Sequence, residues 1–205
     1  MVKKRVLTAA LIVAGMASVA QAQILTNLLA NGGFEDDGGT PGALGVTIPS
    51  GWGISGSGTG WVAHDTGYFV DAIAVKLWTS DSSIYQDVAV AEGLTYQADA
   101  QAIDQLNDPL VNRDVLIKVE WFDSGMGSLG VDEVGRVIGG TDASGAWKNL
   151  TAQLVSPAGA ETARIIYQLV DTGADPRGAA YADEFSFGRV GSGKVGLRLF
   201  SIRNE

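Results

Sequence analysis

Carboxylates are the most frequent reactive groups in this sequence. Its 205 residues include 23 Asp and Glu against 14 Lys and Arg, with one His and no Cys, which gives a formal net charge of -9. Without Cys the chain has no thiol nucleophile, no disulfide and no Cys-ligated zinc or iron-sulfur centre. A single His excludes a multi-histidine metal site within one chain, and the acidic balance argues against duplex nucleic acid as a partner.

Three patterns are similar to catalytic or phosphate-binding motifs, and none has the context that such a motif requires. The run Gly125–Gly130 matches Gly-x-Gly-x-x-Gly, but β-branched residues follow it where a helix N-terminus would be needed. His64 stands beside Asp65 without an evident serine partner. Carboxylate pairs of the kind that a glycosidase uses are available in any chain this acidic. We therefore expect no enzymatic activity, and a glycoside-active enzyme is the third option.

The first 22 residues have the three parts of a secretory signal peptide. Basic residues at positions 3–5 precede an apolar run at Val6–Val19, and a small-x-small pattern ends at Ala22. We expect cleavage near Ala22 and export to the periplasm or out of the cell. No later stretch approaches the roughly 18 apolar residues of a spanning helix, so we expect no membrane insertion.

The other end of the chain also changes in composition. Residues 189–205 hold four basic residues and one acidic residue, and they include a Gly-Ser-Gly sequence. We expect a loosely ordered basic tail here; an edge strand or a sorting tail is the alternative.

Apolar residues recur with a period of two between these ends, which is typical of half-buried strands. The alternation is clearest at Leu94–Ala102, Val115–Phe122 and Ala163–Leu169. Further strand candidates are Ile24–Ala30, Ala72–Trp78, Ser83–Val90, Asp132–Ile138, Trp147–Val155 and Ala180–Phe187. Short strands separated by turn residues, without a long helical period, predict an all-β domain at 23–188 that folds as an antiparallel β-sandwich.

The segment Asp36–Gly60 is rich in Gly and has no long apolar run. This composition predicts a long loop, and long loops in small domains often bind ligands or ions. Trp52 and Ile48 are the residues that we expect to fasten this loop to the core.

Several short motifs, taken in their order along the chain, resemble the carbohydrate-binding modules of the galactose-binding-like jelly-roll fold. They are Asn27–Glu35, Gly51-Trp52, Ala63–Asp65, Ser83–Val88 leading into Gly93–Tyr96, Trp147 before a strand that ends in Ser156-Pro157, and Tyr181–Phe185. The resemblance covers roughly residues 24 to 188. It implies a jelly-roll sandwich of two antiparallel sheets with adjacent first and last strands, and a noncatalytic protein that binds a polysaccharide or glycan.

The resemblance also implies a structural calcium ion. In such modules calcium commonly lies between the acidic residue after an Asn-x-Gly-Phe start and an Asp of the last strand, which correspond here to Glu35 and Asp183. Six or more oxygen ligands would be completed by backbone carbonyls near Gly33, or by Asp36, Asp37 and Asp65. The alternative is that these carboxylates are ordinary polar residues at strand ends.

Aromatic side chains are the first candidates for sugar contact, because pyranose rings have apolar faces that pack on flat rings. Trp61, Tyr68 and Trp78 stand beside expected loops and are the candidate platforms. The other tryptophans, Trp52, Trp121 and Trp147, are assigned to structural positions. Burial of all five Trp would instead favour an exported surface or matrix protein that serves as a structural or adhesive unit without a sugar site.

Polar side chains on central strands are the second group of candidates. Gln101, Lys118 and Glu120 lie on the polar face of their strands, where hydrogen bonds to sugar hydroxyls can form. Simple solvent exposure is the alternative for all three.

Overall fold

Ten β-strands and one short 3-10 helix (η1, Glu35–Asp37) make up the regular structure of the described part of this computed structural model. The described residues are 24, 26–37, 48–55, 62–65 and 73–191, with 55 and 62–65 described by their backbone alone. They all belong to one compact unit, Gln23–Gly191. The expected signal peptide at 1–22 and most of the basic tail lie outside them. No helix among these residues is long and apolar enough to cross a membrane.

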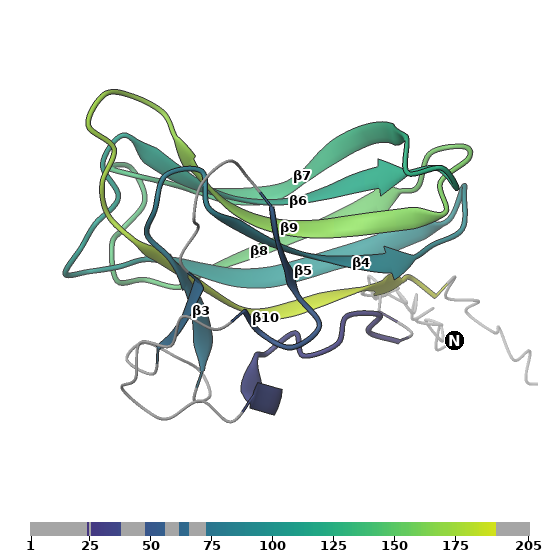
Figure 1. Ribbon diagram of the computed structural model, residues 1–205, viewed down its shortest axis with the longest axis horizontal. Coiled ribbons are helices and arrows are strands. Elements are labelled where there is room, and N and C mark those ends of the chain that lie inside the picture. The colour runs from purple at the N-terminus through teal and green to yellow at the C-terminus, as the bar shows by residue number, and fades with distance from the viewer. Residues whose placement is uncertain (1–23, 25, 38–47, 56–61, 66–72, 192–205) are drawn as a thin grey trace, which may run out of the picture. The chain divides into compact units, whose positions relative to one another are not determined.

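The strands form two five-stranded antiparallel sheets, which Figure 1 shows as two layers. We call one of them the front sheet and the other the back sheet. In spatial order, the front sheet contains β1 (Gly53–Ser55), β4 (Ser83–Ala89), β9 (Thr162–Asp171), β6 (Arg113–Phe122) and β7 (Ser128–Ile138). The back sheet contains β2 (Val62–Asp65), β3 (Ala74–Leu77), β10 (Ala180–Arg189), β5 (Thr95–Asp104) and β8 (Lys148–Val155). The predicted all-β jelly-roll sandwich is confirmed.

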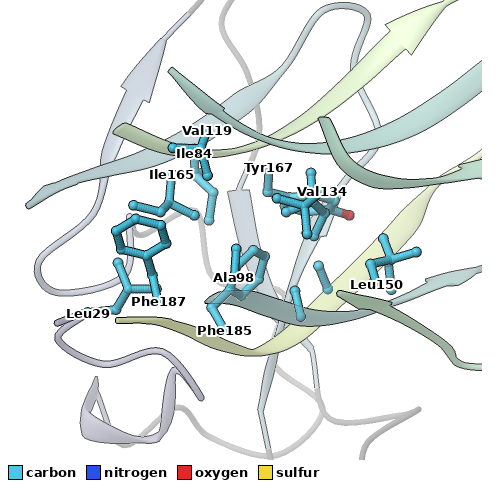
Figure 2. Close-up of a cluster of buried hydrophobic side chains, with 14 of the residues drawn as sticks. Leu29, Ile84, Ala98, Val119, Val134, Leu150, Ile165, Tyr167, Phe185 and Phe187 are labelled. Atoms are coloured by element: carbon cyan, nitrogen blue, oxygen red, sulfur yellow. The ribbon is translucent and has the colours of Figure 1, made fainter. Parts of the chain in front are cut away.

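The core lies between the two sheets and is built from the alternating apolar residues of both (Figure 2). Ile84, Val119, Ile165 and Tyr167 of the front sheet face Ala98, Leu150, Phe185 and Phe187 of the back sheet. The rings of Tyr96 and Phe187 stack with centroids 5.2 Å apart and planes 3° from parallel. Burying both inner faces in this way is what holds a sandwich together.

The segment expected as a strand at Ile24–Ala30 does not form one, and this part of the prediction is wrong. The described residues there lead into a segment that we call the N-terminal strap (residues 26–37), which turns at Asn31–Phe34 and ends in η1. An isolated bridge between Ile24 and Val190 precedes it. The side chain of Asn27 takes the place of a backbone ladder, because its Oδ1 accepts hydrogen bonds from the N–H groups of Leu29 (3.1 Å) and Phe187 (3.0 Å).

The N-terminal strap runs beside the half of β10 that β3 leaves open. Strand β3 pairs only with Ala180–Ala182 of β10. Beyond that point Leu28 N–H donates to the Phe187 carbonyl at 2.7 Å, and Phe185 N–H donates to the Gly32 carbonyl at 3.0 Å. The strap therefore covers backbone groups that an open sheet edge would expose, and the first and last described segments are neighbours.

Three aromatic rings fasten the strap to the sandwich. Phe34 lies 5.3 Å from Trp52 and 5.7 Å from Phe185 between ring centroids, and Trp52 lies 5.2 Å from Phe185. Gly32 allows the close approach, since a Cβ there would lie 2.1 Å from the Phe185 carbonyl oxygen. Trp52 is buried as expected, whereas Ile48, the other residue expected to fasten the loop, is 44% exposed.

Two short strands were not predicted. Strand β1 lies inside the Gly-rich segment expected as a loop, and β2 follows that segment. Each has only three or four residues, which is too short for a period of two to show in the sequence.

Candidate functional site

The polar residues expected to share one ligand surface lie on opposite sides of the sandwich. Lys118 and Glu120 are on β6 of the front sheet and alternate with its buried core residues. Gln101 is on β5 of the back sheet, where it pairs with Asp183. The structure therefore does not bring Gln101 together with Lys118 and Glu120. Alternation predicts which side chains face outward, but not which sheet a strand joins.

The aromatic candidates do not lie on the front face where they are described. Trp78 directly follows β3 of the back sheet, and its ring centroid is 5.6 Å from Lys76 Nζ. Trp61 and Tyr68 lie outside the described residues. Trp147, assigned to a structural position, is half-buried and packs against a small apolar cluster of Ala74, Ile103 and Tyr181 in the back sheet.

The outer face of the front sheet has three aligned rows of side chains across β4, β9 and β6. Each row takes one residue from each strand in register. The rows are Ser83–Gln168–Leu116, Tyr85–Ile166–Lys118 and Asp87–Arg164–Glu120. The apolar residues of these rows are Ile166, which is only 6% exposed, and the half-buried Leu116. Amide, phenol, ammonium and carboxylate groups lie around them.

Tyr85 and Arg164 were not among the residues singled out from the sequence. The Arg164 guanidinium carbon lies 4.1 Å from the Tyr85 ring centroid and 5.1 Å from that of Phe122. The signal that could have found them is alternation with buried neighbours, since Tyr85 follows Ile84 and Arg164 lies between Ala163 and Ile165. Nothing in the sequence showed that these two strands would be adjacent.

Most charges on this face are already paired. Arg164 donates to both carboxylate oxygens of Asp87 at 2.7 and 2.8 Å, and these hydrogen bonds raise the pKa of Arg164. Arg136 donates to both carboxylate oxygens of Glu133 at 2.7 and 2.5 Å, which lowers the pKa of Glu133. By contrast, Lys118 makes no ion pair within the described part of the chain.

Glu120 is a further hydrogen-bonding group on this face. Glu120 accepts a hydrogen bond from Ser128 Oγ at 2.8 Å, and a carboxylate has several further acceptor positions. The arrangement can bind hydroxyl groups by hydrogen bonds and a small apolar surface by contact with the half-buried Tyr85 ring and Leu116.

The segments that carry the expected calcium ligands meet at one junction of the back sheet. Glu35 Oε1 accepts a hydrogen bond from Ile73 N–H at 2.8 Å, and the next residue, Ala74, pairs with Asp65 of β2. A Cβ on Gly33 would lie 3.9 Å from Glu184 Oε1, which places the strap against β10 just after Asp183.

Asp183 lies at a β-bulge of β10 and is only 1% exposed. Its Oδ1 accepts a hydrogen bond from Glu184 N–H at 2.7 Å, and Glu184 has a positive φ of 55°. Among residues with described side chains, which exclude Asp65, no group of three or more His, Cys, Asp or Glu is arranged to hold a metal ion. The donor types at the junction, carboxylates and backbone carbonyls, are those that calcium takes.

In the described part of the chain, the carboxyl groups of Glu133 and Asp142 have pKa values below their ordinary values. Arg136 lowers the pKa of Glu133, and hydrogen bonds from Ile138 N–H and Lys148 lower that of Asp142. A general acid in glycoside hydrolysis needs the opposite shift. Neither group is suited to that role.

Comparison with known proteins gives matches at the level of structure alone. No protein-family model and no curated protein matches the sequence. A xylan-binding domain of carbohydrate-binding module family 22 has 14% sequence identity and a TM-score of 0.53, over 82% of this chain and 96% of that domain. The chain has the fold of a carbohydrate-binding module.

Two further structures share this module fold. The C-terminal family 22 module of Clostridium thermocellum Xyn10B matches with 16% identity and a TM-score of 0.52, over 79% of this chain and 97% of that one. The enzymatically active domain of bacteriophage CBA120 tailspike protein 4 matches with 14% identity and a TM-score of 0.56, over 80% of this chain. The chain spans only 21% of that tailspike domain, so it corresponds to one part of a larger enzyme but to almost all of a binding module.

Proposed function

We propose that the chain is a secreted, noncatalytic module that binds a polysaccharide or glycan on the outer face of its front sheet and is stabilised by calcium. The observation that carries the proposal is the set of half-buried groups on that face, where Tyr85, Lys118 and Glu120 lie in aligned rows beside Leu116. Shallow sites of this kind recognise sugars through hydroxyl hydrogen bonds and apolar contact.

The fold supports a binding role over a catalytic one. The two family 22 modules are matched over nearly their whole length, and one of them is a xylan-binding domain. The tailspike match covers a small part of an enzyme. Export rests on the signal peptide expected at residues 1–22.

Affinity electrophoresis over plant, algal and bacterial polysaccharides tests glycan binding. We expect retardation by at least one polysaccharide, and xylan is the first to test because of the structural neighbours. The double variant Lys118→Ala/Glu120→Gln removes two groups of the proposed surface and should migrate as if no polysaccharide were present. Absence of retardation for the wild type across the panel would contradict the proposal.

A calcium ion would bind where the N-terminal strap meets β10, with Glu35 and Asp183 as carboxylate ligands and a carbonyl near Gly33 and Asp65 as further oxygens. The burial of Asp183 supports this, since a buried carboxylate is stable only when hydrogen bonds or a cation offset its desolvation. The ion would supply positive charge between segments far apart in the sequence and would take no part in a reaction.

Thermal unfolding with and without chelator tests this proposal. If calcium is present at about 100 times its dissociation constant, it adds about 2.7 kcal/mol to the free energy of unfolding, and chelation lowers the Tm accordingly. In Asp183→Asn the chelator should have little effect. An unchanged Tm of the wild type after chelation would rule the ion out.

A structural or adhesive unit without a sugar site is the second candidate. Trp52 and Trp121 are core residues, and no described Trp is exposed on the front face. The same electrophoresis screen separates the two functions, because a structural unit would show no retardation on any polysaccharide.

A further inference from the structure

A network of side chains on the outer face of the front sheet is centred on Arg164. Arg164 of β9 binds both oxygens of Asp87 on β4, and its guanidinium lies against the rings of Tyr85 and Phe122. Exposed ion pairs contribute about 0 to 1 kcal/mol to stability. A bidentate pair combined with two ring contacts instead fixes the orientation of the guanidinium relative to the two rings.

Tyr85 is the residue that this network holds most closely. On one side its ring lies over Gly53 of β1, where a Cβ would be 2.8 Å from Cζ and 3.0 Å from both Cε1 and Oη. Arg164 contacts the ring from β9, the strand on the other side of β4. With Gly53 and Arg164 both against it, the ring has little freedom to change rotamer.

A second arginine, Arg113, shows what a purely structural arrangement looks like in the same fold. Arg113 is buried and binds Asp171 at 2.8 Å. It also donates to the carbonyls of Trp78 and Gly178 at 3.1 and 3.0 Å and so links separate loops. Asp87, Tyr85 and Phe122, which Arg164 contacts, are in contrast all on strands of the front sheet.

We propose that Arg164 is a positioning residue for glycan binding: it holds Tyr85 in the conformation that contacts the glycan, without binding the glycan itself. The proposal rests on the proposed function of the front face. Asp87 accepts from Nε and Nη2 of Arg164, and the guanidinium lies 4.1 Å from the Tyr85 ring centroid, so Arg164 is placed to act through that ring. The Tyr85 hydroxyl, in the same row as Lys118, is then presented in a fixed place before the ligand arrives, which reduces the entropy lost on binding.

Isothermal titration of the full chain with xylohexaose, or with an oligosaccharide of whichever polysaccharide retards the wild type, tests the proposal. The variants are Arg164→Lys, Tyr85→Ala and the double variant, with Arg113→Lys as the matched control. We expect Arg164→Lys and Tyr85→Ala each to weaken binding about tenfold. In the Tyr85→Ala background Arg164→Lys should have no further effect, because its contribution passes through the ring. Arg113→Lys should lower the Tm and leave affinity unchanged.

Two results would overturn the proposal while glycan binding stands. One is an Arg164→Lys variant with wild-type affinity. The other is an equal loss in the wild-type and Tyr85→Ala backgrounds, which would mean that Arg164 acts independently of the ring. A wild type that binds none of the oligosaccharides would overturn the proposed function and this proposal with it, so the two failures are distinguishable. Order parameters of the Tyr85 ring, measured by NMR without ligand, should fall in Arg164→Lys, and a purely structural role would leave them unchanged.

Discussion

The two outer faces of the sandwich differ in what their side chains are bonded to. On the back sheet, Asp99 of β5 accepts hydrogen bonds from Gln97, Thr151 and Ser186, and the N-terminal strap occupies part of the β10 edge. On the front sheet, Lys118 makes no ion pair among the described residues, and Glu120 accepts a hydrogen bond from Ser128. The back sheet thus contributes hydrogen bonds that close the fold, and the front sheet carries Lys118 and Glu120, the residues of the proposed ligand surface.

The largest expected effect belongs to the back sheet. Asp183→Ala should lower the free energy of unfolding by about 3 kcal/mol, because it removes a buried carboxylate that accepts the Glu184 N–H and leaves that donor unsatisfied. Urea denaturation measures the loss, and glycan affinity should not change. Gln101→Ala, at the paired position of β5, is the control and should cost little. A loss below about 0.5 kcal/mol for Asp183→Ala would mean that the junction does not stabilise the fold.

The front face should show the reverse pattern. Lys118→Ala and Glu120→Gln should each weaken glycan binding about tenfold, or about 1.4 kcal/mol, since each removes a hydrogen-bonding group at the ligand surface. Their Tm should remain near that of the wild type. Gln153→Ala on the exposed side of β8 serves as the control for titration calorimetry. If Gln153→Ala weakened binding more than either front-face variant, the two faces would have been assigned the wrong way round.

Two buried tyrosines, one in each sheet, should respond in opposite directions. The Tyr167 hydroxyl on β9 has no hydrogen-bond partner within the described part of the chain, and burial raises its pKa. Tyr167→Phe should therefore raise the free energy of unfolding by about 1 kcal/mol.

Tyr96 on β5 is the matched control, because its hydroxyl accepts a hydrogen bond from Ala91 N–H at 2.8 Å. Tyr96→Phe should lower the free energy of unfolding by about 1 kcal/mol. Denaturation curves that show a loss for both variants would indicate that the Tyr167 hydroxyl is satisfied in solution.

The smallest expected effect is a pH dependence on the front sheet. Arg136 lowers the pKa of Glu133 below its ordinary value of 4.5. The ion pair therefore contributes fully above about pH 4.5 and is lost as the pH falls through the lowered pKa. Since both side chains are about 40% exposed, the contribution is only about 0.5 kcal/mol.

Denaturation of the wild type and Glu133→Gln at pH 7 and pH 3 measures this contribution. The wild type should lose more stability than the variant over that range, and 0.5 M salt should reduce the difference. An identical loss in both proteins would show that the pair contributes nothing.

The sequence predicted the sandwich well because most of its strands are long enough for alternation to show. Strands β5, β6 and β9 have ten residues each, and their buried positions follow the predicted pattern. A strand was also predicted at Ile24–Ala30, a segment that overlaps the strap. Hydrogen bonds that Asn27 Oδ1 accepts from Leu29 N–H and Phe187 N–H override the strand tendency there, and side-chain competition of this kind is not visible in a hydrophobic pattern.

The candidate site could be predicted only in part. Lys118 and Glu120 were identified because they alternate with core residues of one strand. Tyr85 and Arg164 have the same signal, but their importance comes from their contact across β4 and β9, whose residues are about 77 positions apart. The alternation of residues within one strand contains no information on which strands pair with each other. For the same reason Gln101, with the same alternation, was grouped with residues of the opposite sheet.

The most direct test of the account is an NMR titration of the full chain with xylohexaose or an oligosaccharide of the polysaccharide that retards it. The account predicts that the largest amide shifts fall on β4, β9 and β6, centred on Tyr85, Ile166 and Lys118, while amides of β5, β8 and β10 change little. Shifts centred on the back sheet around Gln101, or no shift with any oligosaccharide, would contradict it.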